Sequence, residues 1–151
     1  MILLSTRMCI ICCSEFIRGY YAGQKTTATS LAEKFKLNIR TLNPALNKLT
    51  RAKILRSQVG GVDRGYILTR DPHDISIYDI IIASQGVNYM KTCNVALKGA
   101  TCALPDCNDC ILFKTSKMIT DQISEEYKKI SIYDLYHNQE GLSTEGLQIF
   151  K

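Results

Sequence analysis

The sequence has few of the residues and patterns that enzymes and membrane proteins need. It contains only two histidines, His73 and His137, and neither belongs to a Ser/His/Asp or paired-carboxylate arrangement that indicates catalysis. No apolar run approaches the roughly 18 residues of a membrane span. The apolar stretch 8–13 is too short for a signal peptide and lacks its cleavage site. We therefore expect a cytoplasmic protein that is not an enzyme.

A skewed distribution of charge is the first positive feature. The chain has 151 residues, which suits one domain or a domain with an appendage, and a formal net charge of +5. Residues 1–70 carry twelve Lys and Arg against three Asp and Glu, whereas residues 71–151 carry seven against eleven. The asymmetry suggests that the basic half meets a polyanion, with an unevenly charged solvated surface as an equal alternative.

Two short helices joined by a tight turn are predicted in the basic half. Thr27 can cap the first helix, which carries Leu31 and Phe35, and Asn38 can cap the second, which runs to about residue 52. Apolar residues recur on one face of the second helix, while its other face is polar and basic. This pattern is typical of a helix-turn-helix, whose second helix enters the major groove of DNA.

A β-hairpin is predicted directly after this helix. Residues 54–57 and 66–69 have the pattern of strands on either side of the glycine-rich tip 60–65. A hairpin in this place is the wing of a winged helix, so we expect a mainly α fold with a small β-hairpin wing (α+β) and a long additional helix. The candidate DNA contacts are the side chains suited to base edges or phosphates, although each alone also fits an ordinary polar surface: Arg40, Thr41, Asn43, Asn47, Lys48 and Arg51 in the helix, and Arg56, Ser57, Gln58 and Arg64 at the wing.

Further helices are predicted in the acidic half. Ser76 and Ser131 each precede an aspartate by three residues, a capping-box variant that opens a helix. Between them, residues 108–129 are expected to form one long amphipathic helix, and a helix outside a compact small domain usually needs a partner for its apolar stripe. We therefore divide the chain into a DNA-binding domain, 1–85, and a cysteine-loop and dimerisation region, 86–151. The stripe contains Leu112, Ile119, Ile123 and Tyr127.

Four of the seven cysteines lie within eighteen residues, in the spacing C-x8-C-x4-C-x2-C: Cys93, Cys102, Cys107 and Cys110. The stretch contains glycine and proline and has no apolar period, so we expect a loop. Thiolates on a loop can bind an iron–sulfur cluster or a soft metal. A structural tetrathiolate zinc site is an alternative because the last two cysteines form a chelating pair. Free thiols or a thiol redox switch are a third interpretation.

The other cysteines, Cys9, Cys12 and Cys13, are expected to pack in the core, since cysteine is among the most buried residue types. They belong to a predicted first helix that Ser5 caps. We expect Gly19 to end this helix.

Sequence blocks throughout these elements match one family. The blocks are Leu31-Ala32-Glu33-Lys34, Leu42, Leu46 and Leu49, Arg51-Ala52-Lys53-Ile54-Leu55-Arg56-Ser57, Gly65-Tyr66-Ile67-Leu68, Asp71-Pro72, Ile75-Ser76-Ile77-Tyr78-Asp79-Ile80-Ile81, and Ile130-Ser131-Ile132-Tyr133-Asp134-Leu135. In this order they make the chain resemble the IscR/NsrR/CymR family of bacterial winged helix-turn-helix transcription regulators, and the resemblance covers nearly the whole chain.

This resemblance implies a homodimer joined through the helix around 108–129, bound to a palindromic operator in double-stranded DNA. It also implies an iron–sulfur cluster (2Fe-2S or 4Fe-4S), which a purified sample can lack, as the sensor of redox state, nitric oxide or iron–sulfur status. Cys93, Cys102 and Cys107 fall where the cluster-binding branch has three cysteine ligands, and Cys110 falls where some members have a histidine.

The chain also departs from the family pattern. The wing tip is one residue longer, Pro44 lies inside the recognition helix, and Lys36 and Lys53 replace glycines common at two turns. Met8 stands where some members have a fourth ligand from the partner subunit, a poor ligand that favours Cys110, with Cys9 as an outside candidate. The longer wing and the proline leave open a protein-interaction module that has lost DNA readout.

Overall fold

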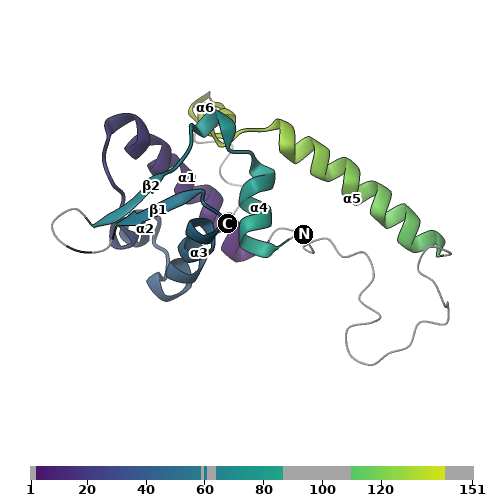
Figure 1. The fold of residues 1–151 in the computed structure, drawn as a ribbon, viewed down its shortest axis with the longest axis horizontal. Helices are drawn as coiled ribbons and strands as arrows, with labels where there is room; N and C mark the ends of the chain where they lie inside the picture. Colours follow the sequence, from purple (N-terminus) through teal and green to yellow (C-terminus); the bar gives the residue numbers. More distant parts are fainter. Residues whose placement is uncertain (1–2, 59, 61–63, 87–109, 142–151) are drawn as a thin grey trace.

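The computed structural model describes residues 3–58, 60, 64–86 and 110–141 (Figure 1). It is mainly helical, with one two-stranded antiparallel sheet in the described part, which confirms the predicted fold class. In chain order the elements are α1 (Leu4–Ala22), α2 (Ala28–Phe35), α3 (Ile39–Arg51), β1 (Leu55–Gln58), β2 (Gly65–Leu68), the 3-10 turn η1 (Pro72–Asp74), α4 (Ile77–Gln85), α5 (Ile111–Lys129) and α6 (Ile132–Gly141).

Helix α1 runs further than the sequence pattern predicted. Gly19 lies inside the helix, which ends at Gly23 in the left-handed region (φ 64°). A Cβ on Gly19 would lie 2.7 Å from the carbonyl oxygen of Gln24, so this glycine permits the chain to turn back closely over the helix. The predicted Ser5 cap is also wrong, because the helix begins at residue 4 without a side-chain cap.

The predicted caps of the helix-turn-helix are confirmed. Thr27 Oγ1 accepts a hydrogen bond from the Ser30 amide at 3.1 Å, and Asn38 Oδ1 accepts one from the Arg40 amide at 2.9 Å. These bonds satisfy N–H groups that a helix start otherwise leaves unpaired. The inner face of α3 is buried against the core through Leu42, Ala45, Leu46 and Leu49.

The core fills the space among α1, α3, α4 and the hairpin. The three cysteines of α1 belong to it, as predicted: Cys9 and Cys12 are fully buried and Cys13 is 3% exposed. Phe16 and Ile17 follow them on the same face of α1, so this helix forms the centre of the core.

Helices α2 and α3 both end on a lysine in the left-handed region, Lys36 (φ 52°) and Lys53 (φ 57°). At the end of α3, the Lys53 amide donates to the Thr50 carbonyl and the Ile54 amide donates to the Leu49 carbonyl, both at 3.0 Å. This pattern is a Schellman motif, in which glycine is the favoured residue at the left-handed position. The left-handed backbone conformation therefore explains why glycine is common at these two turns in the family.

We expect Lys53→Gly to raise the free energy of unfolding by about 1 kcal/mol, because glycine has no Cβ to strain the left-handed backbone. The measurement is the denaturant midpoint at constant m-value. Lys53→Ala is the matched control, since it removes the same charge and keeps the Cβ. Equal gains in both variants would show that charge, and not backbone strain, destabilises this turn.

The two Ser-Ile-Tyr-Asp segments meet in space. Ser76 and Ser131 form an antiparallel bridge, flanked by hydrogen bonds from the Ile77 amide to the Ile130 carbonyl (2.9 Å) and from the Ile132 amide to the Ile75 carbonyl (2.8 Å). Each serine also closes the predicted capping box with the aspartate three residues later. The C-terminal end of α5 is thereby fixed to the start of α4.

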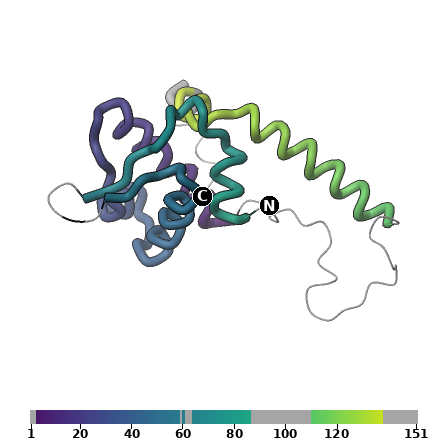
Figure 2. Tube along the Cα trace, viewed as in Figure 1, coloured from purple at the N-terminus to yellow at the C-terminus, as the bar shows by residue number. Residues whose placement is uncertain are grey.

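Helix α5 extends away from the rest of the structure (Figure 2). Its 19 residues span about 28 Å and none is buried. Its C-terminal end packs near α4, where the Lys128 ammonium lies 5.0 Å from the centre of the Tyr78 ring. Its apolar stripe is open: Leu112 is 67% exposed, Ile119 48% and Ile123 37%. No described helix is both long and apolar enough to cross a membrane.

Candidate nucleic-acid interface

The outer face of α3 is a polar and basic ridge. The buried leucines and Ala45 define its inner face, and at about 100° per residue the side opposite carries Arg40, Pro44, Asn47 and Arg51. All four are exposed, as are the remaining candidate DNA contacts of the helix and hairpin. Helix α3 continues through Pro44. The proline therefore removes one backbone hydrogen-bond donor but does not end the helix.

A groove of about 420 Å³ lies beside this ridge and joins α3 to the hairpin. It brings together five candidate residues, Asn43 and Asn47 from α3 and Ser57, Gln58 and Arg64 from the hairpin. Sequence reasoning missed other side chains that line the groove: Thr27, Thr29, Ile39 and Tyr66. The signal for Ile39 was available, because it lies four residues before Asn43, on the same side of the helix.

The hairpin is held against the start of α2 by main-chain bonds. The Thr26 amide donates to the Tyr66 carbonyl at 3.0 Å, and the Tyr66 amide donates to the Thr26 carbonyl at 2.8 Å. Gly65 permits this approach, because a Cβ there would lie 3.1 Å from the Thr26 carbonyl oxygen. Arg40, Thr41 and Arg56 are exposed but do not line the groove.

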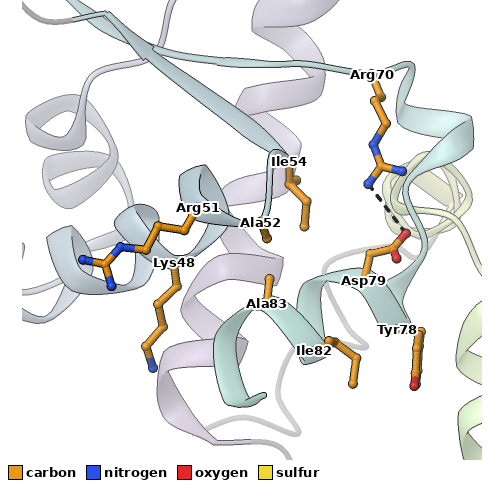
Figure 3. A pocket seen from close by; sticks show the side chains of 9 residues that line it. All are labelled: Lys48, Arg51, Ala52, Ile54, Arg70, Tyr78, Asp79, Ile82 and Ala83. Carbon is orange, nitrogen blue, oxygen red and sulfur yellow. Dashed lines mark ion pairs between the residues drawn. The ribbon is translucent and has the colours of Figure 1, made fainter. Parts of the chain in front are cut away.

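Lys48 and Arg51 line a different cavity, of about 460 Å³, between α3 and α4 (Figure 3). The Lys48 ammonium donates to the Ser84 carbonyl oxygen at 2.8 Å. This contact directs Lys48 towards α4, so its predicted role at DNA stays a prediction. On the far side of the cavity, Arg70 and Asp79 form a long ion pair at 3.9 Å, which is too exposed to add much stability.

The last turn of α4 is therefore fixed from two sides. Besides the bond from Lys48, the buried hydroxyls of Ser84 and Thr6 lie 2.6 Å apart. Helix α4 ends at Gln85, eight residues before Cys93, and its last turn contacts both α3 and α1.

Three of the predicted cluster ligands, Cys93, Cys102 and Cys107, lie outside the described residues. Cys110 is the N-cap residue of α5; it is partly buried, and its side chain makes no capping hydrogen bond. Among the described residues, no group of three or more His, Cys, Asp and Glu side chains could hold a metal ion.

The three cysteines of α1 are buried thiols with raised pKa values. Burial raises the pKa of Cys9 to about 11 and that of Cys12 to about 12, and it raises the pKa of Cys13 well above the ordinary thiol value. In the structure described, these side chains are neutral thiols at physiological pH. Met8 is buried as well, with 4% of its surface exposed.

A family model for Rrf2, described as an iron-dependent transcriptional regulator, matches residues 7–138. The chain belongs to the Rrf2 family. No match was found among curated proteins. The earlier resemblance is thus confirmed, because CymR and IscR, whose structures are similar to this one, are members of the same family.

Three solved structures illustrate the similarity of this Rrf2 protein to others in fold. The global cysteine regulator CymR of B. subtilis shares 19% identity, covering 91% of this chain and 97% of its own, with a TM-score of 0.63. IscR of T. potens shares 19%, covering 99% and 96%, with a TM-score of 0.67. CymR of Staphylococcus aureus shares 18%, covering 89% and 96%, with a TM-score of 0.64.

The different environments of the cysteines in this Rrf2 protein give a direct labelling prediction. In a variant with Cys93, Cys102 and Cys107 changed to serine, we expect a thiol reagent at about pH 8 to label Cys110 alone in the native state, because buried, protonated thiols react slowly. Mass spectrometry should find all four remaining cysteines labelled after unfolding. Fast native labelling of any α1 cysteine would contradict the described core.

The two histidines come together in this Rrf2 chain although they are far apart in sequence. The ring centre of Tyr133 lies 3.7 Å from that of His73 and 4.2 Å from that of His137. Neighbouring Asp134 has a lowered pKa, mainly because Ser131 donates hydrogen bonds to it. This cluster fixes the start of α6 to η1, and periodicity gave no signal for it.

Proposed function

We propose that this Rrf2 protein is a homodimeric transcription regulator that binds a palindromic operator in double-stranded DNA. The observation that carries the proposal is the shared groove of Asn43, Asn47, Ser57, Gln58 and Arg64, beside the exposed ridge of α3. Helix α3 would enter the major groove, with the hairpin as a wing along the backbone or minor groove. A protein with this role works in the cytoplasm.

The proposed contacts divide into two kinds. Asn43 and Asn47 can bond base edges, and Arg40 can bond a guanine or a phosphate. Arg51, Arg56, Ser57, Gln58 and Arg64 suit phosphates and the minor groove, and Thr41 suits a phosphate or a thymine methyl. Lys48 would contact DNA only by leaving the Ser84 carbonyl.

We expect the double variant Arg40→Ala/Arg51→Ala to weaken operator binding and to flatten its salt dependence by about one unit of log–log slope for each phosphate that an arginine no longer neutralises. Fluorescence anisotropy at several salt concentrations measures both quantities. Arg18→Ala, an exposed arginine on α1, is the control. Unchanged affinity and slope in the double variant would remove these residues from the interface.

A second copy of the chain is the proposed partner of α5. The open stripe is long enough for an apolar helix contact, and residues 86–151 would form the dimerisation region. A dimer must present its two α3 helices about 34 Å apart to reach successive major grooves. The fixed junction between α4 and α5 would set this separation.

The proposed sensor is an iron–sulfur cluster held by Cys93, Cys102, Cys107 and Cys110. The support is the family, the place of Cys110 at the start of α5 and the position of the cysteine-rich segment between α4 and α5 in the sequence. Such a cluster supplies a group that responds to redox state and nitric oxide. A thiol or zinc regulator without a cluster is the second candidate, and the similarity to CymR, named a global cysteine regulator, favours it.

Anaerobic purification followed by an absorption spectrum and by iron, sulfide and zinc analysis separates these candidates. Iron and sulfide that disappear together in Cys107→Ser support the cluster, whereas zinc alone supports the tetrathiolate site. A colourless, metal-free protein that binds its operator would contradict the cluster. A pure interaction module would give no specific gel shift with its own promoter.

A further inference from the structure

One side of α3 carries a row of three uncharged side chains, Ile39, Asn43 and Asn47, spaced four residues apart. All three are exposed and all three line the groove shared with the hairpin. We propose that this row reads adjacent A·T base pairs, with the two amides on adenines and Ile39 on a thymine methyl group. The proposal rests on the DNA-binding function above and specifies which bases that function recognises.

The chemistry of the amides supports adenine. In the described part of the chain, neither Asn43 nor Asn47 has a hydrogen-bond partner for its side chain, so both amides are open at the groove. An amide presents a donor and an acceptor, which match the N7 acceptor and N6 donor of adenine in the major groove. Guanine presents two acceptors there, and a cation would suit it better. Among the described residues that line the groove, the one cation is Arg64, which comes from the hairpin.

Ile39 differs from the leucines of α3 in being exposed. Leu42, Leu46 and Leu49 are fully buried, whereas Ile39 is 39% exposed at the start of the helix. N-terminal residues of a recognition helix are the ones that contact base edges. The thymine methyl is the apolar group that the major groove displays, so a thymine beside the adenines would cover Ile39.

The groove suits DNA in charge as well. No aspartate or glutamate is among the described residues that line it, and Arg64 enters it from the hairpin. A·T-rich DNA has a narrow minor groove of enhanced negative potential, which attracts arginine. The row on α3 and the arginine of the wing therefore favour the same class of sequence.

The test begins with the anaerobically purified full chain and a random double-stranded DNA library. We expect the selected half-site to contain adjacent A·T pairs. Replacing the contacted thymine by uracil, which lacks the methyl group, should weaken wild-type binding about fourfold, the effect of one buried methyl-sized group. Ile39→Ala should bind the thymine and uracil duplexes equally. Asn43→Ala and Asn47→Ala should each lose about 5- to 150-fold discrimination between A·T and G·C at one position.

Ile11→Ala and Gln24→Ala are the controls, because they truncate an exposed isoleucine and an exposed amide that do not line the groove. Both should keep wild-type discrimination. A selected site with G·C pairs at these positions, or no difference between thymine and uracil, would overturn the A·T readout and leave DNA binding intact. If the protein selects no sequence from the library, and if salt does not weaken its retention of DNA, the proposed function would be overturned as well. The uracil experiment on the wild type needs no variant to fold.

Discussion

Replacing Ile119 and Ile123 together with glutamate should convert the protein to a monomer and lower its operator affinity by at least about 100-fold. The two side chains form the centre of the open stripe on α5 and are 48% and 37% exposed in the single chain. Charges at these positions cannot be buried in an apolar helix contact without a large desolvation cost. Without the dimer, each α3 binds one half-site and the gain from linked binding disappears.

Sedimentation and fluorescence anisotropy measure the two effects separately. Lys114→Glu is the matched control, because it changes the net charge by the same two units on an exposed residue outside the stripe. The control should stay dimeric. A double variant that remains dimeric would show that the subunits associate through another surface, whereas a monomer with unchanged affinity would show that DNA binding does not need the dimer.

Leu46→Ala should lower the free energy of unfolding by about 2–5 kcal/mol, the range for truncating a fully buried leucine. Leu46 lies on the inner face of α3 with no exposed surface, so its truncation leaves a cavity beneath the recognition helix. The measurement is the urea midpoint with its m-value.

Leu4→Ala, at a leucine that is 73% exposed, is the control and should change stability by less than about 0.5 kcal/mol. A cost below about 1 kcal/mol for Leu46→Ala would mean that α3 is not packed as described, and its outer face would then be assigned wrongly too.

Local sequence signals were sufficient to predict most of the helices and strands in the first 85 residues. Thr27, Asn38 and Ser76 were recognised as caps because a short side chain that bonds a nearby amide needs no tertiary information. The inner face of α3 was recognised because its apolar period is regular. The ends of the hairpin strands were predicted within one residue for the same reason.

The errors arose where the structure depends on a contact between residues that are distant in the sequence. Gly19 was assigned to a helix end, but its missing Cβ accommodates the returning chain at Gln24. The bond from Lys48 to the Ser84 carbonyl was also not foreseen, although the role of Lys48 at DNA stays a prediction. Ile39 was assigned to no site because an apolar residue is expected to face inwards, although its spacing of four residues from Asn43 placed it on the same side of the helix.

The capping boxes illustrate the limit of pattern reasoning. Ser76 and Ser131 were each predicted to start a helix, which is correct, and their likeness was too short to indicate a repeat. Their pairing into one antiparallel bridge depends on where α5 returns to the core. Because this bridge fixes α5 to α4, the geometry of a dimer depends on a contact that neither segment encodes alone.

The central claim is that a dimer of this chain binds DNA through α3 and the hairpin. The most direct test is an anisotropy titration of the purified full chain against a labelled fragment of its own promoter, from about 50 to about 200 mM salt, with the stoichiometry measured by sedimentation. The account predicts saturable binding of two chains per operator and an affinity that falls steeply and linearly on log–log axes. Absence of saturable binding at every salt concentration, or binding that salt does not weaken, would contradict it.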